Sequence, residues 1–402
     1  MAEIRSFQSR KRIRTEEKDI KTEDIDKKIQ RHRQTVFYRI AIAIAIVVAV
    51  VAIFIVHEAT KNYTSISITS EVNWSDNSGI DIIKLGDCLM TYNRDGAVCS
   101  DLNGDTVWNQ TYEMQNPIVS VNGEYAAIAD YNGTTVYVVN STGLQGTISM
   151  SLPIRDLVVS EKGTVVAVVD DNPTTWLYMY SKEGAMLLAA KTSMADYGYP
   201  INLAISSDSK MMMVSYLSAV NGSLSTRVAF YNLQDVGDNY QDNLVSGFNY
   251  TDAIVPMVRF MTDVNSFAVA DNRLMFFSGK EIPTSVKEMI LIENLRDVVY
   301  SDKYVGVVYL NTEGGGKYKM DVYNTLGNNV RTYYFDRDYK EILFANDLVY
   351  IYNGSGIELY TMGGDLKFSG DFAESVTKII PGRTKDKLTL ISSRKIQTAT
   401  LH

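Results

Sequence analysis

The chain has 402 residues, 46% of them hydrophobic, and a net charge of −8. The charge is unevenly divided: residues 1–39 carry twelve Lys and Arg against seven Asp and Glu (+5), and the remainder carries 27 against 40 (−13). An acidic main part lacks the clustered cations that bind a phosphate backbone, which argues against a nucleic-acid partner.

The first segment in chain order, residues 1–36, is predicted to be a basic cytoplasmic tail. It contains the run RKRIR at residues 10–14, followed by alternating acids and bases, which is typical of a solvated segment. Contact with anionic lipid headgroups or with a cytoplasmic partner is the functional interpretation of the same charges.

A transmembrane helix is predicted at residues 37–57. Residues 40–56 are seventeen uncharged apolar residues, and with the flanking aromatic residues they give roughly 30 Å of helix, which matches a bilayer core. Basic residues on the N-terminal side place the tail in the cytoplasm and residues 58–402 outside the cell. A buried strand or core helix and a cleaved signal peptide are the alternatives. The 39-residue leader and the missing A-x-A site favour an uncleaved signal anchor in the cell membrane.

The exported part, residues 58–402, is dominated by a repeated pair of strands joined by a polar turn. The pair recurs eight times, at residues 81–92, 117–130, 154–170, 201–216, 255–271, 295–310, 339–353 and 376–392. Polar inserts, such as 217–226 and 234–243, account for the longest distances between consecutive copies. A third and a fourth strand follow most copies, and four strands in a period of about 40–45 residues predict a β-propeller.

The ends of the chain predict how the ring closes. The eighth copy ends at His402 after its third strand, and the β-branched segment 64–72 lies before the first copy. This segment could supply the missing fourth strand and cover the open sheet edges. We therefore predict an all-β fold with eight blades, with seven as the alternative. Unrelated β-meanders or two β-sandwiches would also give regular strand spacing.

The two cysteines, Cys88 and Cys99, flank the turn Asn93-Arg94-Asp95-Gly96 and are predicted to lie on neighbouring strands of one hairpin. An exported domain permits a disulfide between them. A shift of one residue in register would separate them, so a disulfide and a pair of free thiols both stay open.

The histidines argue against most catalytic chemistry. His32 and His57 precede the propeller and His402 is the last residue, which leaves no histidine inside the ring. Ser-His-Asp and Cys-His catalysis and imidazole zinc sites are therefore not expected, and no catalytic residue, metal site or cofactor is predicted. A pair of carboxylates, as in a glycoside hydrolase, remains an alternative.

Two polar patterns are predicted to be structural. Asp101-Leu102-Asn103-Gly104-Asp105 begins like a calcium loop but lacks the downstream Glu, so it is interpreted as a turn between strands. The 26 tyrosines, many near strand ends, are expected to pack between blades, with an aromatic binding surface as the alternative.

The segment 95–109, DGAVCSDLNGDTVWN, resembles the repeat of pyrroloquinoline-quinone-type propellers through Gly96, Asp101, Gly104 and Trp108. The resemblance supports the fold and little else, because the cysteine pair and tryptophan-rich pocket of the quinone enzymes are missing. The layout of a charged tail, one span and an exported propeller is similar to an uncharacterised family of membrane-anchored proteins of clostridia and related Gram-positive bacteria.

These observations favour a non-catalytic, membrane-anchored module that binds an envelope protein or a cell-wall polymer. A propeller-type glycoside hydrolase with two Asp or Glu, or a receptor that signals through its tail, are the alternatives.

Overall fold

The computed structural model describes residues 31–51, 53, 61–74, 80–172, 174–193, 197–220, 222–251, 253–291 and 295–402. The chain divides between Asn62 and Tyr63 into two units, an N-terminal helical unit and a β-domain.

The helix runs from Arg31 to Val51. Among the described residues it is the one helix long and apolar enough to cross a membrane, and none of its residues is buried. It is already helical N-terminal to the predicted start at residue 37. Residues 1–30, 52 and 54–60, which include most of the predicted tail and His57, lie outside the described part.

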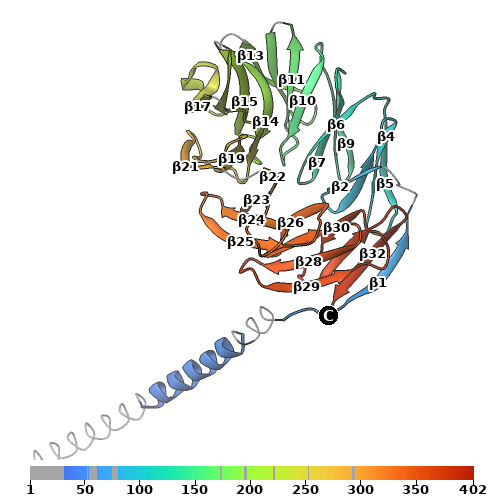
Figure 1. The fold of residues 1–402 in the computed structure, drawn as a ribbon, viewed down its shortest axis with the longest axis vertical. Helices are drawn as coiled ribbons and strands as arrows, with labels where there is room; N and C mark the ends of the chain where they lie inside the picture. Colours follow the sequence, from blue (N-terminus) through green and yellow to red (C-terminus); the bar gives the residue numbers. More distant parts are fainter. Residues whose placement is uncertain are drawn as a thin grey trace, which may run out of the picture. The chain divides into compact units, whose positions relative to one another are not determined.

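The β-domain is an eight-bladed propeller in which eight four-stranded antiparallel sheets follow one another around a common centre (Figure 1). Blade 1 consists of β2 (Asp81–Leu85), β3 (Cys88–Tyr92), β4 (Gly96–Ser100) and β5 (Thr106–Thr111), and blade 2 of β6 (Pro117–Asn122), β7 (Tyr125–Asp130), β8 (Thr135–Asn140) and β9 (Gly143–Ser149). Blade 3 consists of β10 (Ile154–Val159), β11 (Val165–Asp171), β12 (Thr174–Tyr180) and β13 (Met186–Ser193), and blade 4 of β14 (Tyr199–Ile205), β15 (Met211–Val220), β16 (Ser223–Asn232) and β17 (Leu244–Thr251).

Blade 5 consists of β18 (Met257–Phe260), β19 (Asn265–Val269), β20 (Arg273–Ser278) and β21 (Thr284–Ile290), and blade 6 of β22 (Leu295–Tyr300), β23 (Tyr304–Leu310), β24 (Tyr318–Asn324) and β25 (Asn329–Phe335). Blade 7 consists of β26 (Glu341–Ala345), β27 (Leu348–Tyr352), β28 (Gly356–Thr361) and β29 (Leu366–Asp371), and blade 8 of β30 (Lys378–Pro381), β31 (Lys387–Ile391), β32 (Lys395–Leu401) and β1 (Ile66–Asn73). First strands of neighbouring blades contact each other, as β10 does with β6 and β14, so they line the centre. The predicted eight blades are confirmed, and the alternative of seven is wrong.

The ring closes as predicted, because β1 is the outer strand of the last blade. It pairs antiparallel with β32 from Ile66 opposite Leu401 to Asn73 opposite Lys395, and Figure 1 shows the two strands side by side. Next to these pairs, the backbone N–H of His402 donates to the carbonyl of Ser65 at 3.0 Å. The N-terminal strand thus satisfies the hydrogen-bonding edge that β32 would otherwise expose.

Several turns between first and second strands are two residues long, which requires positive φ angles. In blade 1, Leu85 pairs with Cys88 around Gly86, whose φ is +58°. The same turn in blade 7 uses Asn346 and Asp347, with φ of 53° and 56°. Gly and Asn tolerate this region best, so the polar turns of the repeat set the register of each blade.

Both polar inserts of blade 4 have regular structure. The prediction treated residues 217–226 as an insert between strands, but they lengthen the β15–β16 hairpin, where Ala219 pairs with Leu224. The alternation of Ser with apolar residues in this segment is compatible with an exposed hairpin end. The second insert, 234–243, contains the short 3-10 helices η1 (Gly237–Asn239) and η2 (Gln241–Asn243).

The hydrophobic core is divided among the eight junctions between blades. In the described part of the chain, each junction holds one cluster of buried side chains, with nine to fourteen members at seven junctions. The junction of blades 8 and 1 has five: Ile82, Leu89, Ile380, Ile391 and Ile396. The outer half of this junction is therefore not closed by apolar packing.

Candidate functional site

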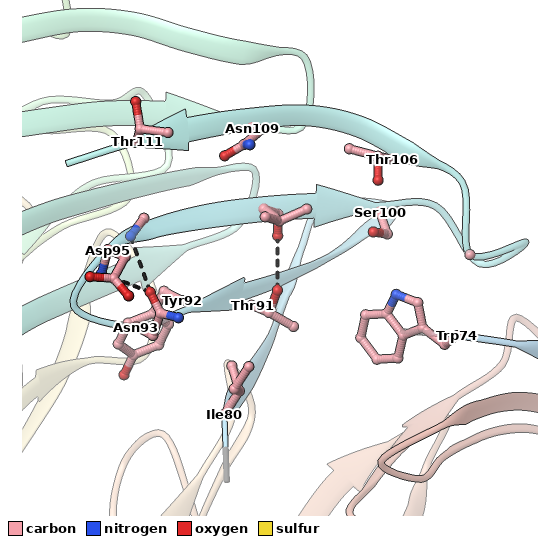
Figure 2. A pocket seen from close by; sticks show the side chains of 13 residues that line it. Trp74, Ile80, Thr91, Tyr92, Asn93, Asp95, Ser100, Thr106, Asn109 and Thr111 are labelled. Carbon is pink, nitrogen blue, oxygen red and sulfur yellow. Dashed lines mark hydrogen bonds between the residues drawn. The ribbon is translucent and has the colours of Figure 1, made fainter. Parts of the chain in front are cut away.

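The junction of blades 8 and 1 contains a pocket of about 390 Å³, which we call the Trp74 pocket. Its volume lies in the usual range of small-molecule sites, about 300–1,000 Å³. It is lined by Trp74, Ile80, Thr91, Tyr92, Asn93, Asp95, Gly96, Val98, Ser100, Gly104, Thr106, Asn109 and Thr111. Figure 2 shows Trp74 at one end of the pocket and Asn93 and Asp95 at the other, with Thr91 between them.

One wall of the pocket is the face of blade 1 that lies toward blade 8. Antiparallel pairing places Ser100 opposite Thr106 and Val98 opposite Asn109, and Thr91 pairs with Val98 from the inner side. Directly opposed residues point to the same face of a sheet, so these side chains form one continuous surface. Short hydroxyl and amide groups dominate it.

Trp74 lies at the end of β1 and is held by both neighbouring blades. Its backbone N–H donates to the carbonyl of Arg394 in blade 8 at 2.7 Å. Its indole packs against the apolar cluster of the junction. On the blade 1 side, the turn at Gly104 comes so close that an added Cβ would lie 3.3 Å from Val72 and 3.9 Å from the indole. Gly104 also has a φ of +81°, so both its conformation and this approach favour glycine.

The polar groups of the wall are largely unused by the protein. Within the described part of the chain, no hydrogen bond is made by the indole N–H of Trp74 or by the side chains of Ser100, Thr106, Asn109 and Thr111. The Thr91 hydroxyl makes a long bond of 3.4 Å to the carbonyl of Val98. Of the lining residues that the structure describes, Asp95 is the one with a charge, and none is Lys, Arg or His. The surface therefore offers free neutral donors and acceptors beside an aromatic ring.

A second pocket, of about 480 Å³, lies among the first strands of blades 2 to 6 at the centre of the ring. Arg259 crosses it and donates to the side-chain oxygen of Asn202 at 2.9 Å, to the carbonyl of Val258 at 2.7 Å and to the hydroxyl of Tyr300 at 3.1 Å. These bonds connect blades 4, 5 and 6. The donors of Arg259 thus serve to join blades, which favours a structural role for this pocket.

Asp156 is the one carboxylate among the described residues that line the central pocket. Burial raises its pKa, and the backbone N–H of Leu157 and the charge of Arg259 oppose that rise only in part.

A third pocket, of about 270 Å³, gathers acids and lysines of blades 4 and 5. There Asp208 accepts hydrogen bonds from the Ser206 hydroxyl at 2.8 Å and from the backbone of Lys210 at 3.2 Å. Burial would raise the pKa of Asp208, but these hydrogen bonds and the Lys210 charge outweigh it and lower the pKa. Such a carboxyl stays ionised and does not match a general acid, whose pKa must be raised.

The two cysteines lie on neighbouring strands, as predicted. Cys99 in β4 pairs with Met90, and Leu89 pairs with Ser100, so Cys88 in β3 is one diagonal step from Cys99. Both thiols are free and buried on the face of blade 1 toward blade 2. Burial raises the pKa of the Cys99 thiol, and the neighbouring Cys88 adds a smaller rise. A disulfide, which the sequence leaves open beside a pair of free thiols, stays an untested alternative.

His402, the last residue of the sequence, lies beside Ser65 and Ser67 at the edge of blade 8. Its Nε2 lies 2.8 Å from the hydroxyl of Ser67 in β1, on an exposed edge of blade 8. In the described part of the chain no carboxylate bonds to the other ring nitrogen, so the Ser-His pair lacks the third group that orients the base in a triad.

The turn at 101–105 has the predicted structural role. The Asp101 carboxylate accepts the backbone N–H groups of Asn103 at 2.8 Å and Asp105 at 2.9 Å, so its oxygens are used within the turn. Trp108, the last residue of the repeat pattern, donates its indole N–H to the carbonyl of Asn140 and thereby links blade 1 to blade 2.

Most predicted site features of the sequence are thus packing and turn features, and the Trp74 pocket was not predicted. Each residue of its wall looks like an ordinary exposed strand residue. The alternation of small polar residues on one face of β4 and β5 was the available signal, and it needs the register and the position of Trp74 to be interpreted.

These features define the class of protein: an eight-bladed β-propeller in a chain with one apolar N-terminal helix, with a polar pocket where the ring closes. The chain belongs to DUF5711, a family of unknown function, whose model matches residues 59–401. No curated protein matches the sequence.

Solved structures resemble the fold at low sequence identity. BamB from Moraxella catarrhalis is 11% identical, with a TM-score of 0.46 over 84% of this chain and all of that chain. Apo AztD from Citrobacter koseri is 9% identical, with a TM-score of 0.49 over 74% of this chain and 86% of that chain. The Pan2 WD40 domain of Neurospora crassa is 9% identical, with a TM-score of 0.42 over 71% and 89%. These likenesses concern the fold alone.

Proposed function

We propose that this protein is a non-catalytic binding module, anchored in the cell membrane by its N-terminal helix, that holds an envelope component outside the cell. The observation that carries the proposal is the Trp74 pocket, where free hydroxyl and amide groups of blade 1 face an aromatic ring. Binding sites combine an apolar surface with a few polar groups that fix orientation, and this pocket has both.

The carboxylates of the pockets support binding over glycoside hydrolysis. A hydrolase of that type needs two carboxyl groups on either side of the scissile bond, one of them protonated. The Trp74 pocket and the central pocket are each lined by one carboxylate among the described residues, Asp95 and Asp156. The acidic third pocket is lined by four carboxylates, Asp208, Asp235, Asp263 and Glu281, and the lowered pKa of Asp208 does not suit the general acid of such a pair.

The location can be tested by labelling introduced cysteines with a membrane-impermeant maleimide in intact cells. Thr106→Cys lies on an exposed strand residue and is expected to react, whereas Ser6→Cys in the predicted tail should react only after lysis. The native thiols are buried and give a low background. Labelling of Ser6→Cys in intact cells would contradict the proposed orientation.

Binding can be tested with a photo-crosslinking amino acid at position 109 of the full-length protein in its own cells. We expect an envelope polymer or protein to be crosslinked at position 109, and none with the same group at Leu326, an exposed residue of blade 6. The proposal fails if position 109 captures nothing above the Leu326 control, or if the purified protein cleaves envelope glycans.

A further inference from the structure

From the Trp74 pocket we infer the chemical class of the ligand: a neutral saccharide chain, one sugar of which stacks on the indole of Trp74. This inference rests on the proposed function and names what the proposed binding module binds. The juxtaposition that carries it is an aromatic ring at one end of a wall of free hydroxyl and amide groups (Figure 2).

A pyranose ring has two kinds of surface, and the pocket matches both. The C–H groups on its faces are apolar and pack on an aromatic ring, while its hydroxyls need hydrogen-bond partners around the rim. Trp74 offers the aromatic surface. Thr106, Asn109 and Thr111 are exposed and offer side chains that hydrogen-bond to no other described residue, so a ligand does not have to break protein contacts to reach them.

The charges of the pocket argue against an anionic ligand. Among the described lining residues there is no Lys, Arg or His, and the carboxylate of Asp95 is the one charge. Phosphate and carboxylate ligands are bound in proteins mainly by Arg, Lys and clustered N–H groups. An anionic polymer would therefore meet repulsion from Asp95 and find no compensating cation.

The ring closure makes the pocket rigid and places it at the junction of blades 8 and 1. Trp74 is fixed by its backbone bond to Arg394 and by the close approach of Gly104, and the wall belongs to a regular sheet. A preformed site loses little side-chain entropy on binding, which favours affinity for a ligand that matches its shape. The open end of the pocket suits an internal unit of a longer chain.

The test uses the full-length protein in phospholipid nanodiscs prepared without glycoside detergents, which would compete for the site. Cellotetraose and chitotetraose probe neutral sugars without and with N-acetyl groups, and poly(glycerol phosphate) is the anionic probe. Calorimetric titration should give binding to at least one neutral tetrasaccharide and none to the anionic polymer. The tetrasaccharide that binds tells whether the natural source is a neutral hexose polymer or an N-acetylated glycan.

The variants separate stacking from general effects on folding. Trp74→Ala should weaken the binding about tenfold or more, Trp74→Phe less, and Asn109→Ala about threefold to tenfold. Trp176→Phe, in blade 3, is the matched control and should leave the affinity unchanged. Equal thermal unfolding midpoints for Asn109→Ala and the wild type show that the effect is local.

Three results would overturn the inference: no binding of either tetrasaccharide, preferred binding of the anionic polymer, or binding that survives Trp74→Ala. If these occur while position 109 still crosslinks to an envelope protein, the saccharide is wrong and the binding module stands. If position 109 also captures nothing, both proposals are wrong.

Discussion

The junction of blades 1 and 2 and the junction of blades 8 and 1 use the two faces of the same sheet in opposite ways. Toward blade 2, blade 1 presents Leu85, Met90 and Cys99, which pack into a cluster of nine fully or nearly buried residues. Toward blade 8, the outer half of the same strands presents Thr91 and Ser100 to a pocket. The difference shows that a ring can stay closed through hydrogen bonds and a small apolar cluster while part of a junction is left without apolar packing.

The corresponding positions of blade 2 show what a closed wall requires. Ile128 and Val139, fully buried between blades 1 and 2, stand in the strands of blade 2 where Thr91 and Ser100 stand in blade 1. Burial of an Ile or Val side chain stabilises a fold by roughly 1.5–3 kcal/mol. The small polar residues of blade 1 give up that stabilisation, which is the pattern expected where binding rather than packing selects the side chain.

The largest effect is expected at a fully packed junction. Phe230 between blades 4 and 5 is completely buried, with its ring centroid 5.2 Å from that of Phe277 and 6.1 Å from that of Phe248. Phe230→Ala should lower the free energy of unfolding by about 3–5 kcal/mol, because it leaves a cavity among aromatic rings. Denaturant unfolding of the full-length protein measures it. A loss below 1 kcal/mol would show that the junction is not rigidly packed.

Placing a residue of the blade 1 wall at the corresponding buried position of blade 2 should lower the free energy of unfolding by a smaller amount. Ile128→Thr places a hydroxyl at a fully buried position in an apolar cluster, so we expect a loss of about 1–3 kcal/mol in unfolding free energy. The measurement is again denaturant unfolding, with Ile128→Val as the control for lost volume. Equal losses for the Thr and Val variants would contradict the role given to the unpaired hydroxyl.

The reverse exchange should cost almost nothing in stability. Thr91 borders the Trp74 pocket, and its hydroxyl makes a weak 3.4 Å contact with the carbonyl of Val98, so Thr91→Ile should change the unfolding free energy by less than about 1 kcal/mol. The larger side chain narrows the pocket and should reduce ligand capture at position 109. If Thr91→Ile destabilises as strongly as Ile128→Thr, the two junctions do not differ as proposed.

The central pocket gives a pH-dependent effect. Burial raises the pKa of Asp156 in the folded protein above its unfolded value of about 3.9, so the folded state binds the proton more tightly and loses stability as pH rises through the folded pKa. Asp156→Asn keeps an oxygen for the N–H of Leu157, which lies 2.8 Å away. The variant should therefore be more stable than wild type at pH 7, and the advantage should shrink as pH falls toward 4. A constant difference in thermal unfolding midpoint between the variant and the wild type across this range would contradict the predicted pH dependence.

The smallest effect concerns thiol reactivity on the two faces of β4. Cys99 faces the packed junction, and burial raises its thiol pKa, so it should react with a maleimide only after unfolding. Val98→Cys places a thiol on the Trp74 pocket and should react in the native protein. Mass spectrometry after alkylation also decides between a disulfide and free thiols, because a bonded Cys88–Cys99 pair stays unmodified until it is reduced.

The sequence predicted the ring but not the pocket, and the reason is physical. The repeated strand pairs follow from the alternation of apolar residues along each strand, and segment 64–72 from the need of a sheet edge for a partner. Both can therefore be predicted without coordinates. Residues 217–226 were misassigned as an insert, although the alternation of Ser with apolar residues there is compatible with the hairpin that they form. The Trp74 pocket depends on Trp74 and Ser100 meeting across the closure, which only the register of two distant strands determines.

Pairing β1 with β32 also has a consequence for the order of folding. The two strands are separated by more than 300 residues, so the last blade cannot be completed before the C-terminal strand has been made. Bringing such distant segments together carries the largest loop-closure cost in the molecule, and contacts of this kind form late and slowly. Until then β1 is an unpaired strand edge, and one wall of the Trp74 pocket has no partner. Ligand binding should therefore report that synthesis and closure of the ring are complete.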